Sequence, residues 1–368
     1  MTVHSADTRW MQLCLELARK GGSAVSPNPL VGALLVRDGE ILGRGFHEVY
    51  GGPHAEVQAI EDALRRGHRP AGARLYVSLE PCVHFGKTAP CVDSIIEHGV
   101  CEVVFGMTDP NPLVAGRSRE ILEANGIKTR GGVLADTCHL LNERYVTCVS
   151  KKRPFVALKS AQSLDGFIAS PHQRGRNITS RRSRVFVHEL RSQYDAILVG
   201  AGTVIVDNPD LTVRYVKGRN PLRIIVDGLL RAPLSSTVYM DAYRVLTMVY
   251  ANAEQEVFHR EKIQILADRG VQIVFLEARY GRIPVASILE DLRKKSVASV
   301  FVEGGAQIHD EFLKAKLVDK MYLFTSPHRL RSGLRGVHIG RLGARAQLQS
   351  RQIGDDFLVE TSFGEHRP

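Results

Sequence analysis

Apolar and polar residues alternate along the first half of the chain with two different periods. Residues 9–20 carry apolar side chains at helical spacing, whereas 31–36 and 41–45 have strand character on either side of the turn pair Asp38-Gly39, which predicts a β-hairpin. Further elements are expected in the order helix, strand, helix, strand, helix, at 54–64, 75–79, 91–98, 103–105 and 116–124. This alternation is typical of α/β layers.

The pattern restarts after Lys151-Lys152-Arg153-Pro154. A helical pattern over 134–149 runs into this basic stretch, its proline is incompatible with a continuing helix, and a strand begins at 155. The later expected elements are strands at 155–160, 196–200, 222–227 and 297–302 and helices at 181–193, 285–294 and 306–315. We therefore predict two three-layer α/β domains, at 1–150 and 151–368.

Composition agrees with two folded domains. The chain has 368 residues, of which 44% are hydrophobic and 24% charged, enough apolar material for two cores. The first ten residues are polar and do not resemble a signal peptide, and no apolar run is long enough to span a bilayer. Six cysteines lie in the first 150 residues, and we expect thiols or metal ligands in a cytoplasmic protein rather than disulfides.

Charge is distributed unevenly between the halves. Residues 1–150 hold 15 Lys and Arg against 17 Asp and Glu, a net of −2, whereas 151–368 hold 34 against 22, a net of +12. A basic half favours anionic ligands such as phosphates, or it is simply a solvated surface. A nucleic-acid partner is an alternative, which the acidic first half and the lack of repeated aromatics between basic residues disfavour.

Four residues in the first half suggest a catalytic metal site. His54 and Glu56 begin a predicted helix, Cys82 follows a strand, and Cys91 opens the next helix. One imidazole and two thiolates are a ligand set that suits zinc and leaves a fourth position for water, whose pKa the metal would lower toward neutrality. The helix starts would favour the thiolate form of Cys91 and, to a lesser degree, of Cys82. Glu56 would then accept the water proton and pass it to a leaving amine, the layout of zinc deaminases.

Two other interpretations of these residues stay open. The cysteines would serve as small core residues if His54 were an ordinary surface histidine. Alternatively, His47 or His84 would complete a closed structural zinc site in a non-enzymatic scaffold. Replacing Glu56 by Gln separates these cases, because a scaffold would not need the carboxylate.

Several motifs occur together around this site and in the second half. In the first half these are Ser26-Pro27-Asn28-Pro29-Leu30-Val31-Gly32, His54-Ala55-Glu56, Leu79-Glu80-Pro81-Cys82 through to Cys91, and Asp109-Pro110-Asn111-Pro112. In the second half they are Ser163-Leu164-Asp165-Gly166, Ile178-Thr179-Ser180, Gly200-Ala201-Gly202-Thr203, Asp207 to Arg214, and Val302-Glu303-Gly304-Gly305. The set resembles the bifunctional riboflavin-biosynthesis deaminase–reductase family from the first helix to about residue 325.

The resemblance implies a cytidine-deaminase-like α/β/α fold for 1–150 and a dihydrofolate-reductase-like α/β fold for 151–368. It implies hydrolytic deamination of 2,5-diamino-6-ribosylamino-4(3H)-pyrimidinone 5′-phosphate to 5-amino-6-(5-phosphoribosylamino)uracil, by a hydroxide on zinc. The second domain would then use NADPH to reduce the ribosyl group to ribityl. The partners implied are this small phosphorylated substrate, no nucleic acid and no membrane. We also expect a homo-oligomer.

The same resemblance assigns residues to each site. His54, Cys82 and Cys91 would bind zinc and Glu56 would be catalytic. The expected substrate contacts are Asn28, His47, His84, Lys87, Arg191, Leu211, Arg214 and Glu303. The expected cofactor contacts are Lys159, Gln162, Asn177, Thr203, Asp207 and Gly305.

Some positions depart from the family pattern. Gly175 and Asn177 stand where relatives carry serine and tryptophan, Phe167 stands where lysine is usual, and Ala89 replaces a common proline. The stretch 325–333 keeps its proline and glycine but lacks an apolar run. Loss of an aromatic platform weakens stacking of a ligand, by about 1 kcal/mol. A deaminase with a degenerate reductase domain is therefore a second hypothesis.

Overall fold

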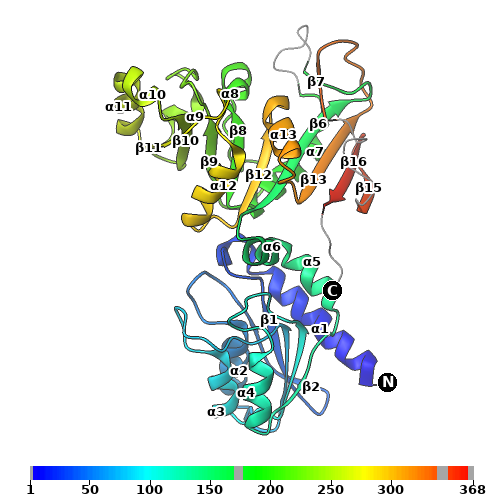
Figure 1. Cartoon of the computed structure of the whole chain (residues 1–368). Helices are drawn as coiled ribbons and strands as arrows, with labels where there is room; N and C mark the ends of the chain where they lie inside the picture. The colour runs from blue at the N-terminus through cyan, green and yellow to red at the C-terminus, as the bar shows by residue number, and fades with distance from the viewer. Residues whose placement is uncertain (1–2, 170–176, 338–346, 364–368) are drawn as a thin grey trace. The chain divides into compact units, whose positions relative to one another are not determined.

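The computed structural model describes residues 3–169, 177–337 and 347–363, and the position of Gly175 lies outside them. The chain divides into two compact units, Met1–Lys152 and Arg153–Pro368, each with its own sheet and hydrophobic core (Figure 1). Among the described residues, no helix combines the length and the apolar character needed to cross a membrane.

The first unit is built on a five-stranded sheet of order β2-β1-β3-β4-β5. The bounds are β1 Gly32–Arg37, β2 Glu40–Phe46, β3 Arg74–Leu79, β4 Glu102–Met107 and β5 Lys128–Arg130. β1 pairs antiparallel with β2 and β3, whereas β3, β4 and β5 run parallel. The predicted hairpin is confirmed, and its turn residues Asp38 and Gly39 both have positive φ, at 52° and 79°.

Helices cover both faces of this sheet. They are α1 Val3–Arg19, α2 Ala55–Arg65, α3 Cys91–Glu97, α4 Arg117–Ala124, α5 Ala135–Leu141 and α6 Glu143–Lys151. Glycines allow two of them to lie directly on the strands: a Cβ on Gly32 would meet the backbone of α1 at Cys14, and one on Gly45 would meet α2 at Ala55. Since Gly45 pairs with Ala33 rather than Gly32, these contacts lie on opposite faces.

The single helix expected over 134–149 is wrong, because the structure divides it at Asn142 into α5 and α6. The Asn142 side chain accepts a hydrogen bond from the Leu30 amide at 2.8 Å and donates one to the Leu30 carbonyl at 3.0 Å. This contact joins the break to the loop that precedes β1.

The second unit contains a nine-stranded sheet of order β11-β10-β9-β8-β12-β6-β13-β16-β15. Its strands are β6 Phe155–Ser163, β8 Ala196–Gly200, β9 Leu222–Val226, β10 Thr247–Asn252, β11 Val271–Leu276, β12 Ser299–Gly304, β13 Lys320–Ser326, β15 Gln347–Ile353 and β16 Asp356–Ser362. The seven strands from β11 to β13 in this order pair in parallel, and β16 and β15 add an antiparallel edge that sequence patterning missed. A short pair, β7 Phe167–Ala169 and β14 Leu334–Arg335, stands apart.

Two layers of helices sandwich this sheet. One face packs against α12 Val285–Lys294 and α13 Ala306–Lys314, whose apolar side chains join alternate residues of the strands. The other face packs against α7 Arg181–Gln193, α8 Ala201–Asp207, α9 Thr237–Met240 and α11 Arg260–Asp268, while α10 Gln255–Phe258 precedes α11. The structure therefore confirms α/β layers in both units.

Candidate active sites

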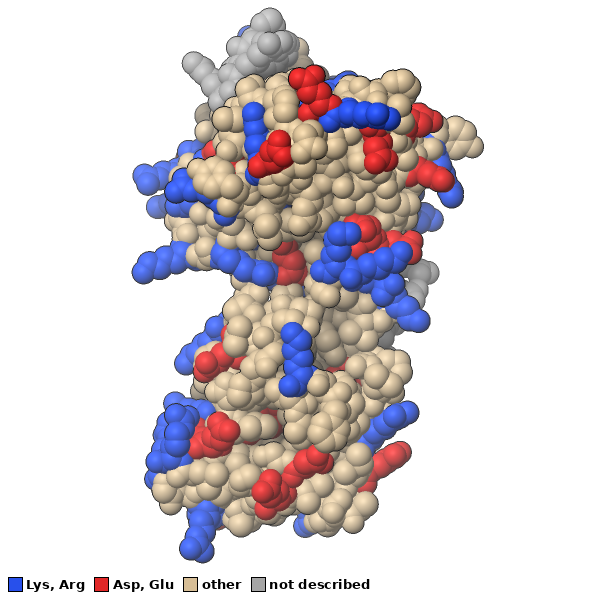
Figure 2. Space-filling model, turned by 90° about the vertical axis from the view of Figure 1, so that its left-hand side faces the viewer, with Lys and Arg blue, Asp and Glu red and all other residues tan. Residues whose placement is uncertain are grey.

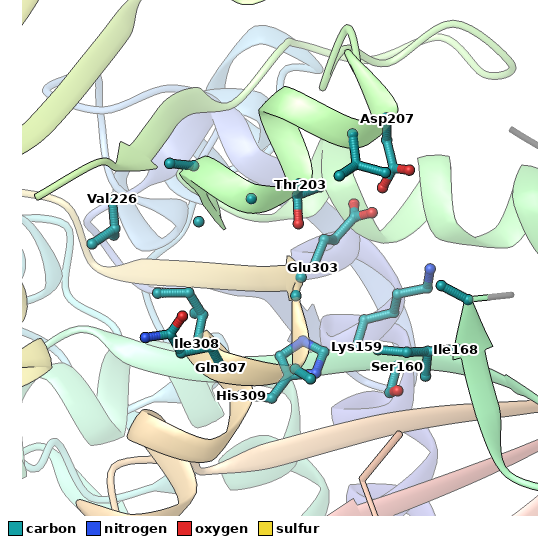
Figure 3. A pocket seen from close by; sticks show the side chains of 18 of the residues that line it. Lys159, Ser160, Ile168, Thr203, Asp207, Val226, Glu303, Gln307, Ile308 and His309 are labelled. Atoms are coloured by element: carbon teal, nitrogen blue, oxygen red, sulfur yellow. The ribbon is translucent and has the colours of Figure 1, made fainter. Parts of the chain in front are cut away.

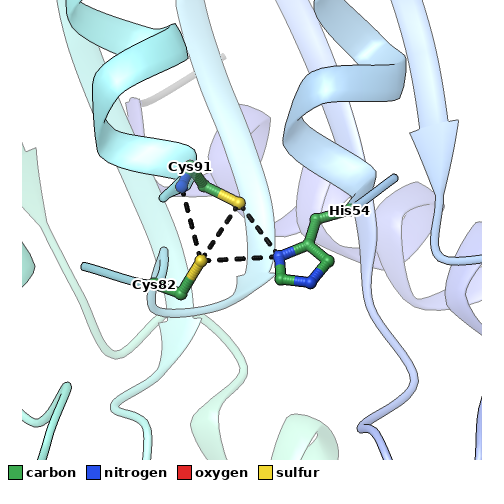
Figure 4. Close-up of side chains that lie close together, drawn as sticks. All are labelled: His54, Cys82 and Cys91. Atoms are coloured by element: carbon green, nitrogen blue, oxygen red, sulfur yellow. Dashed lines mark hydrogen bonds between the residues drawn. The ribbon is translucent and has the colours of Figure 1, made fainter. Parts of the chain in front are cut away.

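Three ligand atoms converge in the first unit (Figure 4). His54 precedes α2, Cys91 is the first residue of α3, and Cys82 follows β3, as the sequence predicted. The His54 Nδ1 lies 3.1 Å from the Cys91 Sγ and 3.4 Å from the Cys82 Sγ, and the two sulfurs are 3.4 Å apart. An imidazole and two thiols that converge in this way are a group that could hold a metal ion.

The donor set fits zinc. With zinc–ligand bonds of about 2.0–2.3 Å, tetrahedral ligand atoms lie roughly 3.5–3.8 Å apart, within a few tenths of an ångström of these separations. His54 Nε2 faces the Thr88 hydroxyl at 3.4 Å, an arrangement that orients a ligating imidazole. Among the described residues, the cluster has three ligands, and neither His47 nor His84 joins it. An open catalytic site is therefore a better match than a closed structural one.

The two thiols share a proton unequally. A hydrogen bond from Cys91 holds the pKa of Cys82 down at about 4, whereas the same contact and burial raise the pKa of Cys91 well above its usual value. Cys82 also accepts the Cys91 backbone N–H at 3.3 Å.

Glu56 occupies the first turn of α2 and is almost completely buried, with 3% of its surface exposed. Burial raises the pKa of its carboxyl to about 7, with a further upward contribution from Cys82 and an opposing one from His54. A carboxyl with such a pKa both accepts and releases protons near neutral pH.

A pocket of about 430 Å³ opens beside these residues, a size typical of a small-ligand site. Asn28 and His47 line it and are hydrogen-bonded to one another. The His47 Nδ1–H donates to the Pro53 carbonyl at 3.0 Å, so that His47 Nε2 accepts from the Asn28 amide nitrogen at 3.1 Å. The Asn28 Oδ1 is then left to accept a hydrogen bond from a ligand.

The remaining predicted contacts and several others complete the pocket. His84 and Lys87 lie on the loop between Cys82 and Cys91, and the Lys87 Nζ stands 3.9 Å from the ring centroid of Tyr50. Residue roles assigned from the sequence did not include Asp109, Asn111 and Tyr145, which also line the pocket. The Tyr145 hydroxyl donates to Asp109 at 2.9 Å, a contact between distant segments.

The second unit has a larger cavity of about 1340 Å³ at the carboxyl ends of β6, β8 and β12 (Figure 3). Ligands of open α/β sheets bind at such ends. The volume exceeds the roughly 300–1,000 Å³ of a pocket for one drug-sized ligand, and so it has room for two molecules.

Charged groups dominate one side of this cavity. Arg191 and Glu303 form a bidentate ion pair that is largely buried, and the Arg191 Nη1 also donates to the Thr212 carbonyl at 3.0 Å. Lys159 stands nearby. Burial lowers its pKa and Glu303 partly restores it. Although burial alone would raise the pKa of Glu303, Arg191 and Lys159 bring it below the usual value.

Most residues predicted for this site meet in the cavity wall. These are Lys159, Asn177, Arg191, Thr203, Asp207, Arg214, Glu303 and Gly305. Two do not. Leu211 is 2% exposed and belongs to the hydrophobic core, because its neighbours are Val204, Val238 and related side chains. Gln162 lies outside the lining and against Gly336.

Two histidines were missed by the sequence analysis. His188 on α7 and His309 on α13 line the cavity and are 4% and 3% exposed. The His188 Nδ1 accepts from the Arg214 amide at 2.9 Å. Burial, reinforced by neighbouring cations, lowers the pKa of each ring to about 4. Single histidines within helical patterns give no sequence signal that distinguishes them from core residues.

The low pKa of His309 predicts acid sensitivity of the second unit. An unfolded chain binds a proton at this residue below about pH 6.5, whereas the folded chain does so only near 4, so stability present above 6.5 is lost as the pH falls. Between pH 7 and pH 5 this difference should lower the free energy of unfolding by on the order of 2 kcal/mol. We expect the variant His309→Leu to abolish that decrease. Denaturant titrations at both pH values measure it, with the exposed His328→Gln as control. An unchanged pH dependence in His309→Leu would contradict the assignment.

Surface charge offers little support for a nucleic-acid interface. On the face shown in Figure 2, Lys and Arg lie interspersed with Asp and Glu rather than in one continuous stripe. Several basic residues of the second unit are paired with acids, including Arg219 with Asp195 and Arg282 with Glu311. Neutralised cations contribute little to phosphate binding.

Comparison with known proteins extends over the whole chain. Residues 154–358 match the family model described as the RibD C-terminal domain, and residues 4–107 match the cytidine and deoxycytidylate deaminase zinc-binding region. The chain is 40% identical over 366 residues to a riboflavin biosynthesis protein RibD of Aquifex aeolicus, covering 97% of this chain and 98% of the relative. It is 34% identical to RibD of Actinobacillus pleuropneumoniae, covering 96% and 94%.

Solved structures agree with these sequences. One is a diaminohydroxyphosphoribosylaminopyrimidine deaminase/5-amino-6-(5-phosphoribosylamino)uracil reductase of Thermotoga maritima, with a TM-score of 0.86, 39% identity and coverage of 98% of this chain and 99% of that one. Another is RibD of Acinetobacter baumannii, with a TM-score of 0.84, 32% identity and the same coverage.

Proposed function

Because the chain belongs to the RibD family of riboflavin biosynthesis proteins and has both its deaminase and its reductase domain, we propose that it acts on the substrates named for its Thermotoga relative. The first unit would deaminate the diaminopyrimidine phosphate, and the second would reduce the ribosyl group of the aminouracil product. The observation that carries the proposal is the His54, Cys82 and Cys91 cluster beside buried Glu56, in a pocket of suitable size.

In the deamination step, Glu56 would carry the proton from the water to the leaving amine. When bound, zinc supplies the polarisation that makes water a nucleophile near neutral pH. The Glu56 carboxylate accepts the water proton and returns it to the departing amine, which leaves as ammonia. A pKa near 7 suits both transfers. Burial of Glu56 keeps bulk water from competing for the proton.

Asn28 and Lys87 would position the substrate. Because His47 occupies the Asn28 amide nitrogen, the Asn28 Oδ1 faces the ligand as an acceptor for a ring N–H or an amino group. The Lys87 ammonium, at the pocket rim beside Tyr50, would bind the 5′-phosphate as a point charge.

The reduction needs a hydride and a proton. When bound, NADPH would supply a hydride for C1′ of the ribosyl group. A proton must reach the ring oxygen, which becomes a hydroxyl when the bond from C1′ to this oxygen breaks. In the net reaction, the ribosylamine gains one hydride and one proton and becomes the ribitylamine. We propose the Lys159 Nζ, a cation in the cavity wall whose pKa burial lowers, as the donor of this proton. Arg191 and Arg214 would contact the substrate, and Thr203 and Gly305 would contact the cofactor.

A two-stage assay tests the proposal. Purified protein should contain about one zinc per chain. It should release ammonia from the diaminopyrimidinone phosphate and then oxidise NADPH in the same tube. Folded, zinc-loaded protein that leaves this compound unchanged would rule out the deaminase assignment.

We also infer a cytoplasmic location, which is supported by six cysteines that form no disulfide among the described residues. The homo-oligomer expected from the sequence stays a prediction.

A further inference from the structure

Two polar side chains in the cavity of the second unit have no hydrogen-bond partner among the described residues. They are Ser160, 2% exposed, and His309, 3% exposed, and both line the cavity. The Ser160 Oγ has no partner, and neither ring nitrogen of His309 makes a well-formed hydrogen bond, although the Val302 carbonyl lies near one of them. Buried polar groups in proteins are nearly always paired, so this concentration of unmet hydrogen-bonding capacity indicates a ligand.

Strand geometry places the two residues together and apart from the charged cluster. Val156 and Leu158 of β6 pack with Phe312 of α13, whereas Phe155 and Ala157 pack with α7. Since side chains alternate along a strand, Ser160 faces α13, and its neighbour Lys159 faces α7 with Arg191 and Glu303. Figure 3 shows the His309 ring extending from α13 toward the part of β6 that carries Ser160.

His309 is a neutral group at this position. Burial and the positive charge of Lys159 oppose its protonation, while Glu303 and the Val302 carbonyl favour it only weakly. A neutral imidazole offers one N–H donor and one acceptor nitrogen, and the Ser160 hydroxyl offers both functions. The pair therefore suits an uncharged group that both donates and accepts, rather than a phosphate or a carboxylate.

We propose that Ser160 and His309 form the subsite for the carboxamide of the nicotinamide cofactor, an inference that rests on the proposed reductase function. A primary amide has an N–H₂ donor and a carbonyl acceptor, matching both side chains. His309 also lies one helical turn from Gly305, since its amide donates to the Gly305 carbonyl at 3.1 Å. The pair thus lies within one helical turn of Gly305, where the backbone would bind the dinucleotide phosphates, and the side of the cavity that carries Arg191 and Glu303 is left for the substrate.

The test compares binding of NADP⁺ and its 3-acetylpyridine analogue, which lacks the amide N–H₂, by calorimetry. The intact chain should bind NADP⁺ about tenfold more tightly than the analogue. Ser160→Ala and His309→Leu should each weaken NADP⁺ binding about five- to tenfold, and the double variant should bind the two compounds equally. Because binding is measured, the result does not depend on turnover.

A matched serine separates ligand binding from folding. Ser299 of β12 is also 2% exposed, but its hydroxyl donates to Asp195 at 2.9 Å and accepts from the Asp195 amide at 3.1 Å. Ser299→Ala should lower Tm and leave NADP⁺ affinity unchanged. Ser160→Ala should leave Tm unchanged, because no protein hydrogen bond is lost, and should weaken NADP⁺ binding.

The possible failures are distinguishable. If the intact chain binds no NADP⁺, the proposed reductase function fails. If it binds NADP⁺ and the variants bind both compounds as the intact chain does, the carboxamide subsite is overturned while the reductase function stands. A change confined to the KM of the sugar substrate would also overturn the subsite, assigning the pair to the substrate.

Discussion

Glu56→Gln is expected to lower the rate of deamination by roughly 10²–10⁴-fold while leaving about one zinc per chain. The amide has the size of the carboxyl but neither accepts the water proton nor returns it to the amine. Metal binding should survive because Glu56 is not among the three converging ligand atoms. Steady-state ammonia release and metal analysis of the same preparation measure the two effects.

The control for this variant is Glu61→Gln, on the exposed side of the same helix. It should change neither activity nor metal content. Deamination at the normal rate by zinc-loaded Glu56→Gln would show that the carboxyl carries no proton, and it would favour the scaffold interpretation of the cluster.

Lys159→Met is expected to lower NADPH oxidation by roughly 10²–10⁴-fold. Methionine keeps most of the length of the side chain but removes the ammonium that we propose as proton donor to the sugar ring oxygen. Stability should be unchanged or higher, because a partly buried cation has been replaced by an apolar group and Glu303 keeps its ion pair with Arg191. Reductase kinetics and thermal unfolding measure the two effects.

Deaminase activity in the same preparation provides the first control for Lys159→Met, and it should equal that of the unaltered chain. Lys314→Met, at the exposed end of α13, should affect neither activity. Unimpaired reduction by Lys159→Met would assign the proton to another group in the cavity.

The zinc cluster was predictable from the sequence because its geometry is largely local. His54 and Cys91 stand at helix starts and Cys82 at a strand end, so patterning alone places all three at one edge of the sheet. Most helices and strands of the first unit were also predicted, since their apolar periods are strong, whereas strands β10, β11 and β13 and helices α8, α9 and α11 of the second unit were not. The reductase fold needed the family resemblance, because glycine pairs and a lone Asp207 are common in ordinary turns.

What the sequence did not reveal depends on contacts between distant segments. The break at Asn142 exists because its amide bonds Leu30, more than a hundred residues earlier. Likewise, Ser160 and His309 face the same cavity only because β6 lies beside β12, the strand that leads into α13. The edge strand β15 was missed because most of its side chains are polar and solvent-exposed, which leaves little alternation to detect.

The central claim is that one chain carries two independent catalytic sites. The most direct test supplies Glu56→Gln protein with the deaminated aminouracil ribosyl phosphate and follows NADPH oxidation. Oxidation at the rate of the unaltered chain is predicted, since the second cavity is complete within Arg153–Pro368. Absence of NADPH oxidation by both the variant and the unaltered folded protein would contradict the claim and leave a deaminase with an inactive second domain.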